Sequence, residues 1–366
     1  MTPIRALERQ DLPSVARLHA KVAGGARGAR LEALLPAFLE RTLFEQPWAD
    51  DEIPSLVYEE DGAIVGFLGS NVRRLRFDGN PIRMACSAHL VADPGAGSRG
   101  VGGLLLRAYL AGPQDLTVTD GANEPVQRMW ETLGGSTVHL SCLAFVVALR
   151  PATLGAHLLV GDRRRAVRAE SLLRPLTALL DRPLARALGP RREQPREPAT
   201  AETLTPEALL EHLAAVAGQL RLVPDYSSEY LRWLFAELDR VGRDEVFPDR
   251  VVRGPLWAEL VRAADRVVGW YVCHLRRGGL CRVLQLASAP GRAPTVFDVL
   301  EQRAAAAGAA GIYGRLEPRL LAPLGERRAL VRTAPARMLV HARDRAIVDT
   351  VLAGDALLTR MDAEWW

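Results

Sequence analysis

The feature of this sequence that most constrains its fold is a glycine-rich run between a strand-like segment and a helix-like one. Residues 82–91 are mostly apolar, residues 93–103 are rich in glycine, and residues 104–110 return to helical spacing. Backbone amides at the start of a helix lack intrahelical partners and carry partial positive charge, so glycine there lets an anion approach the main chain. The run predicts either an anion site at a helix start or a surface loop in which glycine relaxes backbone sterics.

Two common phosphate sites are excluded by the residues of this run. A dinucleotide site needs Gly-x-Gly-x-x-Gly after the first parallel strand and an acidic residue about 20 positions later, and that spacing fails here. A nucleoside-triphosphate loop needs Gly-Lys-Ser/Thr, whereas Lys21 is the only lysine of the chain.

The segments around the run alternate between strand and helix patterns, which predicts an α/β domain over residues 1–150. Asp61-Gly62 predicts a tight hairpin, and Asn123 is a good cap for the helix that follows it. In chain order we expect a strand at 4–7, helices at 11–22 and 31–44, strands at 55–60, 63–77 and 82–91, a helix at 104–110, a strand at 115–120, a helix at 123–133 and a long closing strand at 136–149.

A second unit is expected because 366 residues exceed what one core accommodates efficiently. Residues 151–203 form an arginine- and proline-rich linker with a helical part, and 189–198 contain too little apolar surface to pack. From 204 to 366 the order of the first half returns. We expect helices from 205 and at 227–238, strands at 256–261, 267–275 and 282–287, a helix at 295–307 and strands at 312–316 and 338–341.

Residues 4–150 resemble the GNAT superfamily of acyl-CoA-dependent N-acyltransferases. Ala92-Asp93-Pro94 and the run from Gly97 to Gly102 are in register with the family's Val-x-Pro and Gln/Arg-x-x-Gly-x-Gly/Ala, followed by Leu105 and Leu106 as helix core. Asn123, Trp130 and Gly134-Gly135 are similar to the family's Asn, six residues, Tyr and Gly-Phe pattern. The resemblance implies that backbone amides of the glycine run bind the CoA pyrophosphate.

The resemblance implies a set of residues for the acyl-CoA site. They are Leu90, Val91, Ala92, Gly97, Ser98, Arg99, Gly100, Val101, Gly102, Gly103, Asn123 and Trp130. The chain departs from the family at two of them. Gly97 stands where Gln or Arg is usual, and Trp130 stands where many members have a tyrosine that protonates the CoA thiolate, which an indole N–H cannot do at neutral pH.

Two side chains are candidates for the base that removes the acceptor proton. His89 is the first, because it lies on the strand that separates from its neighbour in this fold and histidine titrates near neutrality. Asp120, at the end of the next strand, is the second. The alternatives are a half-buried structural histidine and a turn residue before Gly121.

The second half has the same hairpin pattern, since Arg266–Trp270 resembles Ala63–Phe67. Its turn at 287–295 lacks Gly-x-Gly and contains prolines, which supply no amide donor, so we expect no CoA site there. The expected fold class is α/β (α+β), two GNAT-like domains in tandem, each a mixed, mainly antiparallel sheet flanked by helices. By resemblance, the degenerate second domain shapes the acceptor site. Residues 362–366 either reach this cleft or form a packed terminal strand, and the packed strand is favoured.

The resulting hypothesis is an N-acyltransferase that moves an acyl group, most simply acetyl, from acyl-CoA to an amine on a small-molecule or amino-acid-like acceptor. The alternative is a catalytically inactive acyl-CoA-binding protein. Acyl-CoA is the expected co-substrate, and no metal is expected. No apolar signal region or membrane span is found, so a cytoplasmic location is expected.

Arginine supplies almost all of the basic charge, and the net charge is only +4. This composition is typical of a GC-rich coding sequence, and no basic strip interleaved with aromatic residues indicates nucleic-acid binding. Over residues 161–189 arginines alternate with leucines, a pattern typical either of a helix on an anionic membrane surface or of a solvated helix between domains.

Overall fold

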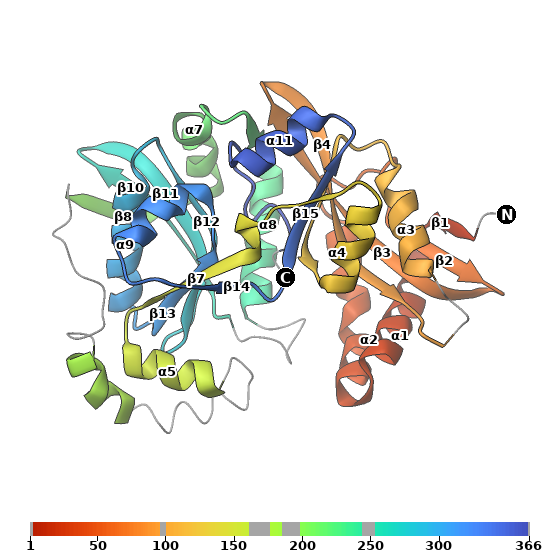
Figure 1. The fold of residues 1–366 in the computed structure, drawn as a ribbon, viewed down its shortest axis with the longest axis horizontal. Coiled ribbons are helices and arrows are strands. Elements are labelled where there is room, and N and C mark those ends of the chain that lie inside the picture. The colour runs from red at the N-terminus through yellow and green to blue at the C-terminus, as the bar shows by residue number, and fades with distance from the viewer. Residues whose placement is uncertain (1–2, 96–99, 161–175, 185–197, 244–252, 365–366) are drawn as a thin grey trace.

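The computed structural model describes residues 3–95, 100–160, 176–184, 198–243 and 253–364, which form two mixed sheets flanked by helices (Figure 1). No helix within these ranges is long and apolar enough to cross a membrane. The predicted fold class is confirmed, because each sheet is mainly antiparallel and contains one parallel pair among the described strands, β4 with β5 and β12 with β13.

The first sheet carries the glycine turn at one end of its parallel pair. Its strands, in spatial order, are β1 (Ile4–Ala6), β2 (Leu56–Glu60), β3 (Ala63–Phe77), β4 (Asn80–Ala92), β5 (Leu116–Ala122), β15 (Arg337–Ala342) and β6 (Ser136–Thr137), and β9 (Leu222–Pro224) also pairs with β3. The predicted hairpin at Asp61-Gly62 is confirmed: both residues have positive φ, 50° and 76°, as a tight turn between β2 and β3 requires.

Helices cover this sheet as the sequence predicted. They are α1 (Leu12–Ala23), α2 (Gly25–Leu39) with a π-helical turn at Glu40–Phe44, α3 (Val101–Leu110) and α4 (Glu124–Thr132), with a 3-10 turn at Arg9–Asp11 before α1. The Asn123 side chain caps α4 by accepting a hydrogen bond from the Val126 amide at 3.1 Å.

The second sheet repeats the arrangement. Its strands in spatial order are β14 (Leu330–Thr333), β7 (Leu143–Ala148), β13 (Gly311–Arg315), β12 (Leu280–Ser288), β11 (Arg266–Leu275), β10 (Leu256–Ala263) and β8 (Ala199–Thr203). The other helices are α5 (Pro151–Val160), a helix at 176–184, α7 (Pro206–Ala217), α8 (Ser228–Gly242), α9 (Ala293–Ala306), α10 (Leu321–Gly325) and α11 (Arg345–Ala353), with 3-10 turns at Leu140–Cys142 and Pro318–Leu320.

The two halves exchange strands, which corrects two expectations. The run at 136–149 is not one closing strand of the first sheet, because a turn at Leu140–Cys142 divides it and β7 pairs with β13 and β14 of the second sheet. The strand expected to complete the second unit, β15, pairs instead with β5 and β6 of the first. An apolar strand buries equally well in either sheet, so its pattern does not specify its partner. The boundaries at 150 and 204 stay a prediction.

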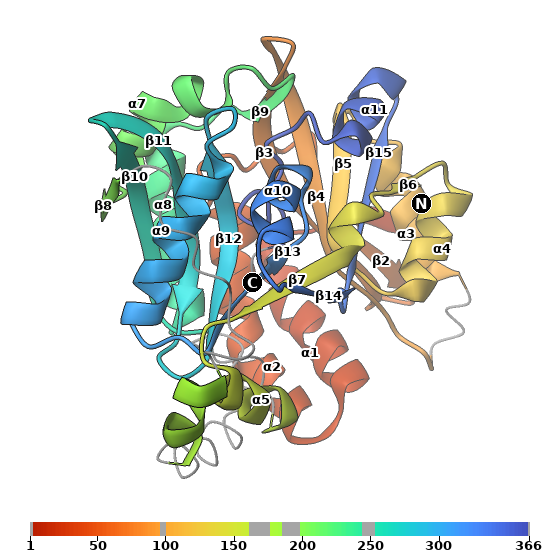
Figure 2. The ribbon, with the colours of Figure 1, turned by 60° about the vertical axis from the view of Figure 1, so that its left-hand side comes forward.

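A shared core joins the halves. One cluster combines Phe38 of α2 and Phe67 of β3 with Leu234 of α8 and Trp270 of β11, all fully buried. Figure 1 shows α8 between the strands of the second sheet and the first half, and Figure 2 shows β15 beside β5 of the first sheet. Within the expected linker, residues 199–203 form the edge strand β8, while its most arginine-rich parts, 161–175 and 185–197, lie outside the described residues.

Candidate functional site

The site begins where β4 and β5 separate. Their parallel pairing runs only from Met84 beside Leu116 to Cys86 beside Val118. Beyond it β4 contains a bulge, because Phe67 opposes Val91 while Gly69 opposes Ala88, which leaves one extra residue on β4. His89 lies in this bulge with φ of 55°, a conformation uncommon for a non-glycine residue.

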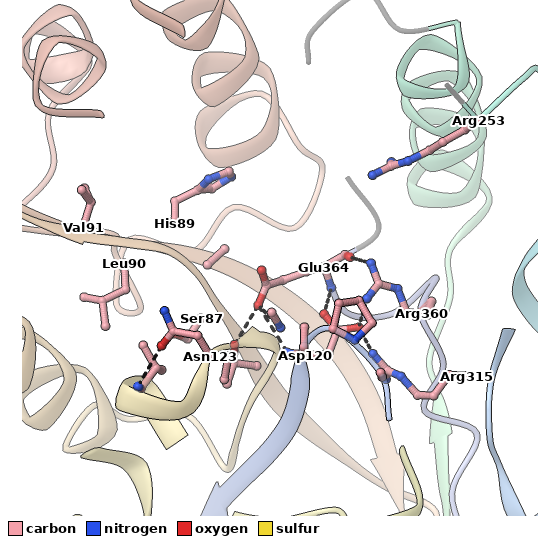
Figure 3. A pocket seen from close by; sticks show the side chains of 18 of the residues that line it. Ser87, His89, Leu90, Val91, Asp120, Asn123, Arg253, Arg315, Arg360 and Glu364 are labelled. Carbon is pink, nitrogen blue, oxygen red and sulfur yellow. Dashed lines mark hydrogen bonds and ion pairs between the residues drawn. The ribbon is translucent and has the colours of Figure 1, made fainter. Parts of the chain in front are cut away.

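A cavity of about 1350 Å³ opens at this separation, between the two halves. Ser87, His89, Leu90 and Val91 of β4 form one side, as Figure 3 shows. The described lining also includes α1 and α2 residues (His19, Val22, Ala26, Arg27, Leu31, Leu35), the end of β5 with Asn123 and Val126, and second-half residues (Arg253, His274, Arg282, Tyr313, Arg315, Arg360, Glu364).

The glycine turn leads from β4 into α3. Gly97, Ser98 and Arg99 lie outside the described residues, but Gly100 precedes α3 with φ of 91°, which favours glycine. No described atom lies within 4 Å of a Cβ built on Gly102, and only the Met129 sulfur, at 3.9 Å, is that close at Gly103. Gly100 is exposed and no described side chain covers Gly102, so an anion can approach the backbone at the start of α3.

Other residues fix this helix start. A Cβ on Gly66 would meet the Val101 side chain at 2.4 Å, so glycine there lets α3 pack directly on β3, with Leu105 and Leu106 fully buried. The single lysine, Lys21 of α1, contacts the Asp93 carboxylate at 2.5 Å, and this contact lowers the pKa of Asp93. Sequence reasoning did not anticipate this link between α1 and the glycine turn.

His89 and Asp120, the two predicted bases, both line the cavity but differ in their surroundings. The His89 ring lies edge-on to His19 and Phe38, with centroids 5.9 Å away in each case. Asp120 is fully buried and ion-paired with Arg315 and, at 3.2 Å, with Arg360. Because two guanidinium groups and a backbone amide occupy its oxygens, the Asp120 carboxylate mainly anchors its neighbours.

The side chain of Glu364 is the carboxylate that sequence reasoning missed. Its Oε1 accepts hydrogen bonds from the Thr119 hydroxyl at 2.7 Å and from the Gly121 amide at 3.0 Å, and its own amide donates to Asp120 Oδ1 at 3.0 Å (Figure 3). No hydrogen bond to Oε2 is found among the described residues. A Cβ on Gly121 would meet Oε2 at 2.3 Å, so glycine at 121 makes room for this carboxylate.

The pKa of Glu364 is raised to about 7, first by burial and then by the negative charge of Asp120. The Thr119 hydrogen bond and the charge of Arg360 partly oppose this rise. The carboxyl group can therefore gain or lose a proton near neutral pH. The segment that carries Glu364 reaches the cavity. Of the two expectations for residues 362–366, a packed strand or a segment in the cleft, this was the less favoured one. Residues 365–366 lie outside the described part.

Trp130 is fully buried in a cluster with Leu105 and Leu106, and it is absent from the described cavity lining. Its Nε1–H has no hydrogen-bond partner among the described residues. Val101 is likewise buried in this cluster, and Ala92 pairs with Gly66 on β3. The proposed contacts of Trp130 with acyl-CoA stay a prediction, as do those of the other predicted site residues.

Within the described residues, no group of three or more His, Cys, Asp or Glu side chains is arranged to hold a metal ion. The turn after β12, where the second half lacks Gly-x-Gly, contributes no residue to the described cavity lining. The carboxyl and imidazole groups in the described lining are those of Asp120, Glu364, His19, His89 and His274.

Comparisons with known proteins agree at the level of fold. No family model matches the chain, and no curated protein matches its sequence. A GCN5-related N-acetyltransferase from Anabaena variabilis superposes with a TM-score of 0.54 at 10% identity, covering 93% of this chain and 73% of that one. One from Kribbella flavida gives 0.51 at 14% identity, covering 93% and 71%. Eis1 from Mycobacterium abscessus gives 0.51 at 13% identity, covering 94% and 74%.

These likenesses extend across both sheets, since each covers more than nine-tenths of the chain. The glycine turn before α3 is one of the motifs that carried the sequence resemblance to GNAT proteins, and the separated strand is a feature that the resemblance implied. The chain has the fold of the GCN5-related N-acetyltransferases, with two such units in tandem.

Proposed function

We propose that this protein is an N-acyltransferase that transfers an acyl group, most simply acetyl, from acyl-CoA to the amine of a small acceptor. The observation that carries the proposal is the placement of Glu364: a carboxyl group with a pKa near neutrality lies at the end of β5, in the cavity where β4 and β5 separate. The fold, shared with N-acetyltransferases, supports it.

Acyl-CoA would lie between the separated strands, with its pyrophosphate at the exposed first turn of α3 around Gly100 and Gly102. The β4 edge from His89 to Val91 would direct backbone donors at the thioester carbonyl, whose oxygen gains negative charge in the transition state. Asn123 would stay mainly a helix cap at the rim of the site.

The acceptor amine would enter from the side of α1, α2 and the second half. As its nitrogen attacks the thioester carbon, a C–N bond forms, the C–S bond breaks and the CoA thiolate leaves. The amine proton passes to Glu364, directly or through a water, and the thiolate takes a proton from solvent or from a cavity group. His89 is the competing base, because it lines the same wall.

Calorimetric titration with acetyl-CoA tests the binding half of this proposal. Gly102→Glu would place a carboxylate against the pyrophosphate, and a side chain fits there without collision, so lost affinity would not reflect misfolding. Gly155→Glu in α5 is the matched control, since its Cβ position is equally open among the described residues. We expect the parent and Gly155→Glu to bind and Gly102→Glu to lose at least tenfold in affinity.

A thiol-release assay with amines then separates the two candidate functions. Amine-dependent release of CoA would support the acyltransferase. Binding of acetyl-CoA without amine-dependent release of free CoA would support the alternative, an acyl-CoA-binding protein. The observation that motivates this alternative is that position 130 holds tryptophan where the family usually has tyrosine. Equal affinities of the parent and Gly102→Glu would refute the CoA site at α3.

A further inference from the structure

The backbone of Glu364 is held at both of its polar groups. Its amide N–H donates to Asp120 Oδ1 at 3.0 Å, and its carbonyl oxygen accepts from Nη2 of Arg360 at 2.6 Å. The other terminal nitrogen of the same guanidinium, Nη1, lies 3.2 Å from Asp120 Oδ2 (Figure 3). These contacts close a ring of the Glu364 backbone, the Asp120 carboxylate and the Arg360 guanidinium, which we call the Arg360 clasp.

Asp120 is the fixed point of the clasp. It is fully buried at the end of β5, and its Oδ2 also contacts the guanidinium of Arg315, a buried residue of β13. Charge-assisted bonds from two guanidinium groups hold this carboxylate in one orientation. The Arg360 side chain is about 30% exposed, so a shorter residue there would not leave a sealed void. Arg360 is therefore the member of the clasp that can be changed with the least harm to packing.

The clasp acts where regular structure does not. Residues 357–364 belong to no helix or strand, so no repeating ladder of backbone hydrogen bonds fixes the position of Glu364. The turn at 360–362 is tied down by Asp362, whose Oδ2 accepts from the Thr359 amide at 3.0 Å and from its hydroxyl at 2.7 Å. Glu364 lies beyond this turn, and its peptide group depends on the clasp instead.

The same contacts place opposite charges beside the Glu364 carboxyl group. Burial raises its pKa most and the charge of Asp120 raises it further, whereas the charge of Arg360 lowers it. Two other titratable groups feel the charge of Glu364, the Cys86 thiol of β4 and the Tyr109 phenol of α3. Burial raises the pKa of both, so they stay neutral at physiological pH. Arg360 is thus the cation that opposes Asp120 at this carboxyl group.

We propose that Arg360 is a positioning residue for acyl transfer: it holds the backbone of Glu364 against Asp120 and so fixes where the carboxyl group meets the acceptor amine. The inference rests on the proposed function, in which Glu364 accepts the amine proton. A general base must lie within hydrogen-bond reach of that proton, and a misplacement of about 1 Å can cost about 10²-fold in rate. Arg360 supplies this precision without touching the acceptor.

Two substitutions separate the geometry of the clasp from its charge. Arg360→Gln removes both, so kcat for thiol release should fall about 10²-fold at unchanged acetyl-CoA affinity, and the rise of kcat/KM with pH should move to higher pH. Arg360→Lys keeps the charge, but one ammonium group cannot reproduce the planar fork. It should keep the rise near pH 7 and recover only part of kcat. Arg345→Gln, which loses a 2.9 Å contact with Asp349 on exposed α11, is the control and should behave as the parent.

Amide hydrogen exchange at Glu364, followed by NMR, provides a readout that does not depend on catalysis. Exchange should be faster in Arg360→Gln than in the parent, because the bond from this amide to Asp120 opens more often. Unchanged exchange together with parental kcat in Arg360→Gln, or full recovery of kcat in Arg360→Lys, would overturn the positioning role and leave the acyltransferase proposal intact. A parent that binds acetyl-CoA but releases no CoA with any amine would refute the proposed function, and with it the role of Arg360 in catalysis.

Discussion

The carboxyl group of Glu364 lies where its charged form is disfavoured, and this makes its role testable. If it acts as the base, kcat/KM should rise with pH through about 7, because the deprotonated form accepts the amine proton. Glu364→Gln should lower kcat by about 10²–10⁴-fold, the usual contribution of a general base. It should also remove the rise of kcat/KM near pH 7, the limb of the pH profile that belongs to Glu364. The measurement is a pH series of thiol release.

Two further variants identify the base. Glu60→Gln, at the exposed end of β2, is the control for a neutralised glutamate and should behave as the parent. His89→Gln should retain the limb near pH 7 if Glu364 is responsible. A profile that keeps this limb in Glu364→Gln and loses it in His89→Gln would assign the base to His89 instead.

At the residue scale, the sequence predicted the parts of the site that depend on neighbouring residues. The cap at Asn123, the buried Leu105 and Leu106, and the left-handed Gly100 all follow from local pattern. Glu364 could not be predicted, because its surroundings come from β5, far away in the chain. The only available signal was a carboxylate directly before Trp365-Trp366.

At the element scale, the segment that delivers Glu364 is held by a buried hydrogen-bond network. Asp362 Oδ2 accepts from the Thr359 amide and hydroxyl at 3.0 and 2.7 Å, and its Oδ1 accepts from the Tyr226 hydroxyl. Gln285 links Tyr226 and Thr359, and its Oε1 accepts from the Trp270 indole at 2.8 Å. The network ties residues 359–362 to β11 and β12, so the second half holds in place the segment whose Glu364 contacts β5 of the first half.

Removing one hydroxyl of this network should loosen the segment. Tyr226→Phe leaves a buried carboxylate short of one donor, which costs about 1–3 kcal/mol of unfolding free energy. We expect a lower Tm, a reduced kcat and unchanged acetyl-CoA affinity, with faster amide exchange at Thr359 because its bond to Asp362 opens more often. Tyr58→Phe, on partly exposed β2, is the control. Unchanged exchange at Thr359 together with unchanged kcat would show that the network does not position Glu364.

Strands β2, β3 and β4 were predicted well, but β8, β9 and β14 were not predicted, and β7 and β15 were predicted with the wrong partners. Alternation and turn residues gave β2, β3 and β4 correctly, since Asp61-Gly62 fixes a hairpin locally. β7 and β15 were assigned to the wrong sheets because every edge of an apolar sheet offers the same hydrogen bonds and similar burial. Only the complete packing decides which strand fills which position.

At the scale of the whole molecule, the exchanged strands and the shared core make the halves dependent on each other. A fragment of residues 1–150 would lack β15 and would expose β7 without its partners, so we expect it to aggregate and to show no cooperative unfolding. Co-expression with residues 151–366 should restore a soluble complex. The full chain should unfold in one transition, with tryptophan fluorescence and circular dichroism coinciding.

A soluble 1–150 fragment that melts sharply by itself would contradict this dependence. Two separate transitions in the full chain would contradict it as well, since they would mean that each half is stable without the strand it receives. Either result would favour the boundaries at 150 and 204 as limits of independent folding units.

The exchange of β15 also sets an order of events during synthesis. The first sheet is not complete when the ribosome has made its first half, because the strand beside β5 is encoded near the other end of the chain. Until then, the open edge of β5 and the apolar strand β7 are both without their final partners, and newly made chain is most prone to aggregation in this interval. Slowing translation should therefore not help this protein fold, and holding chaperones should matter more to it than to a protein whose units close one after the other.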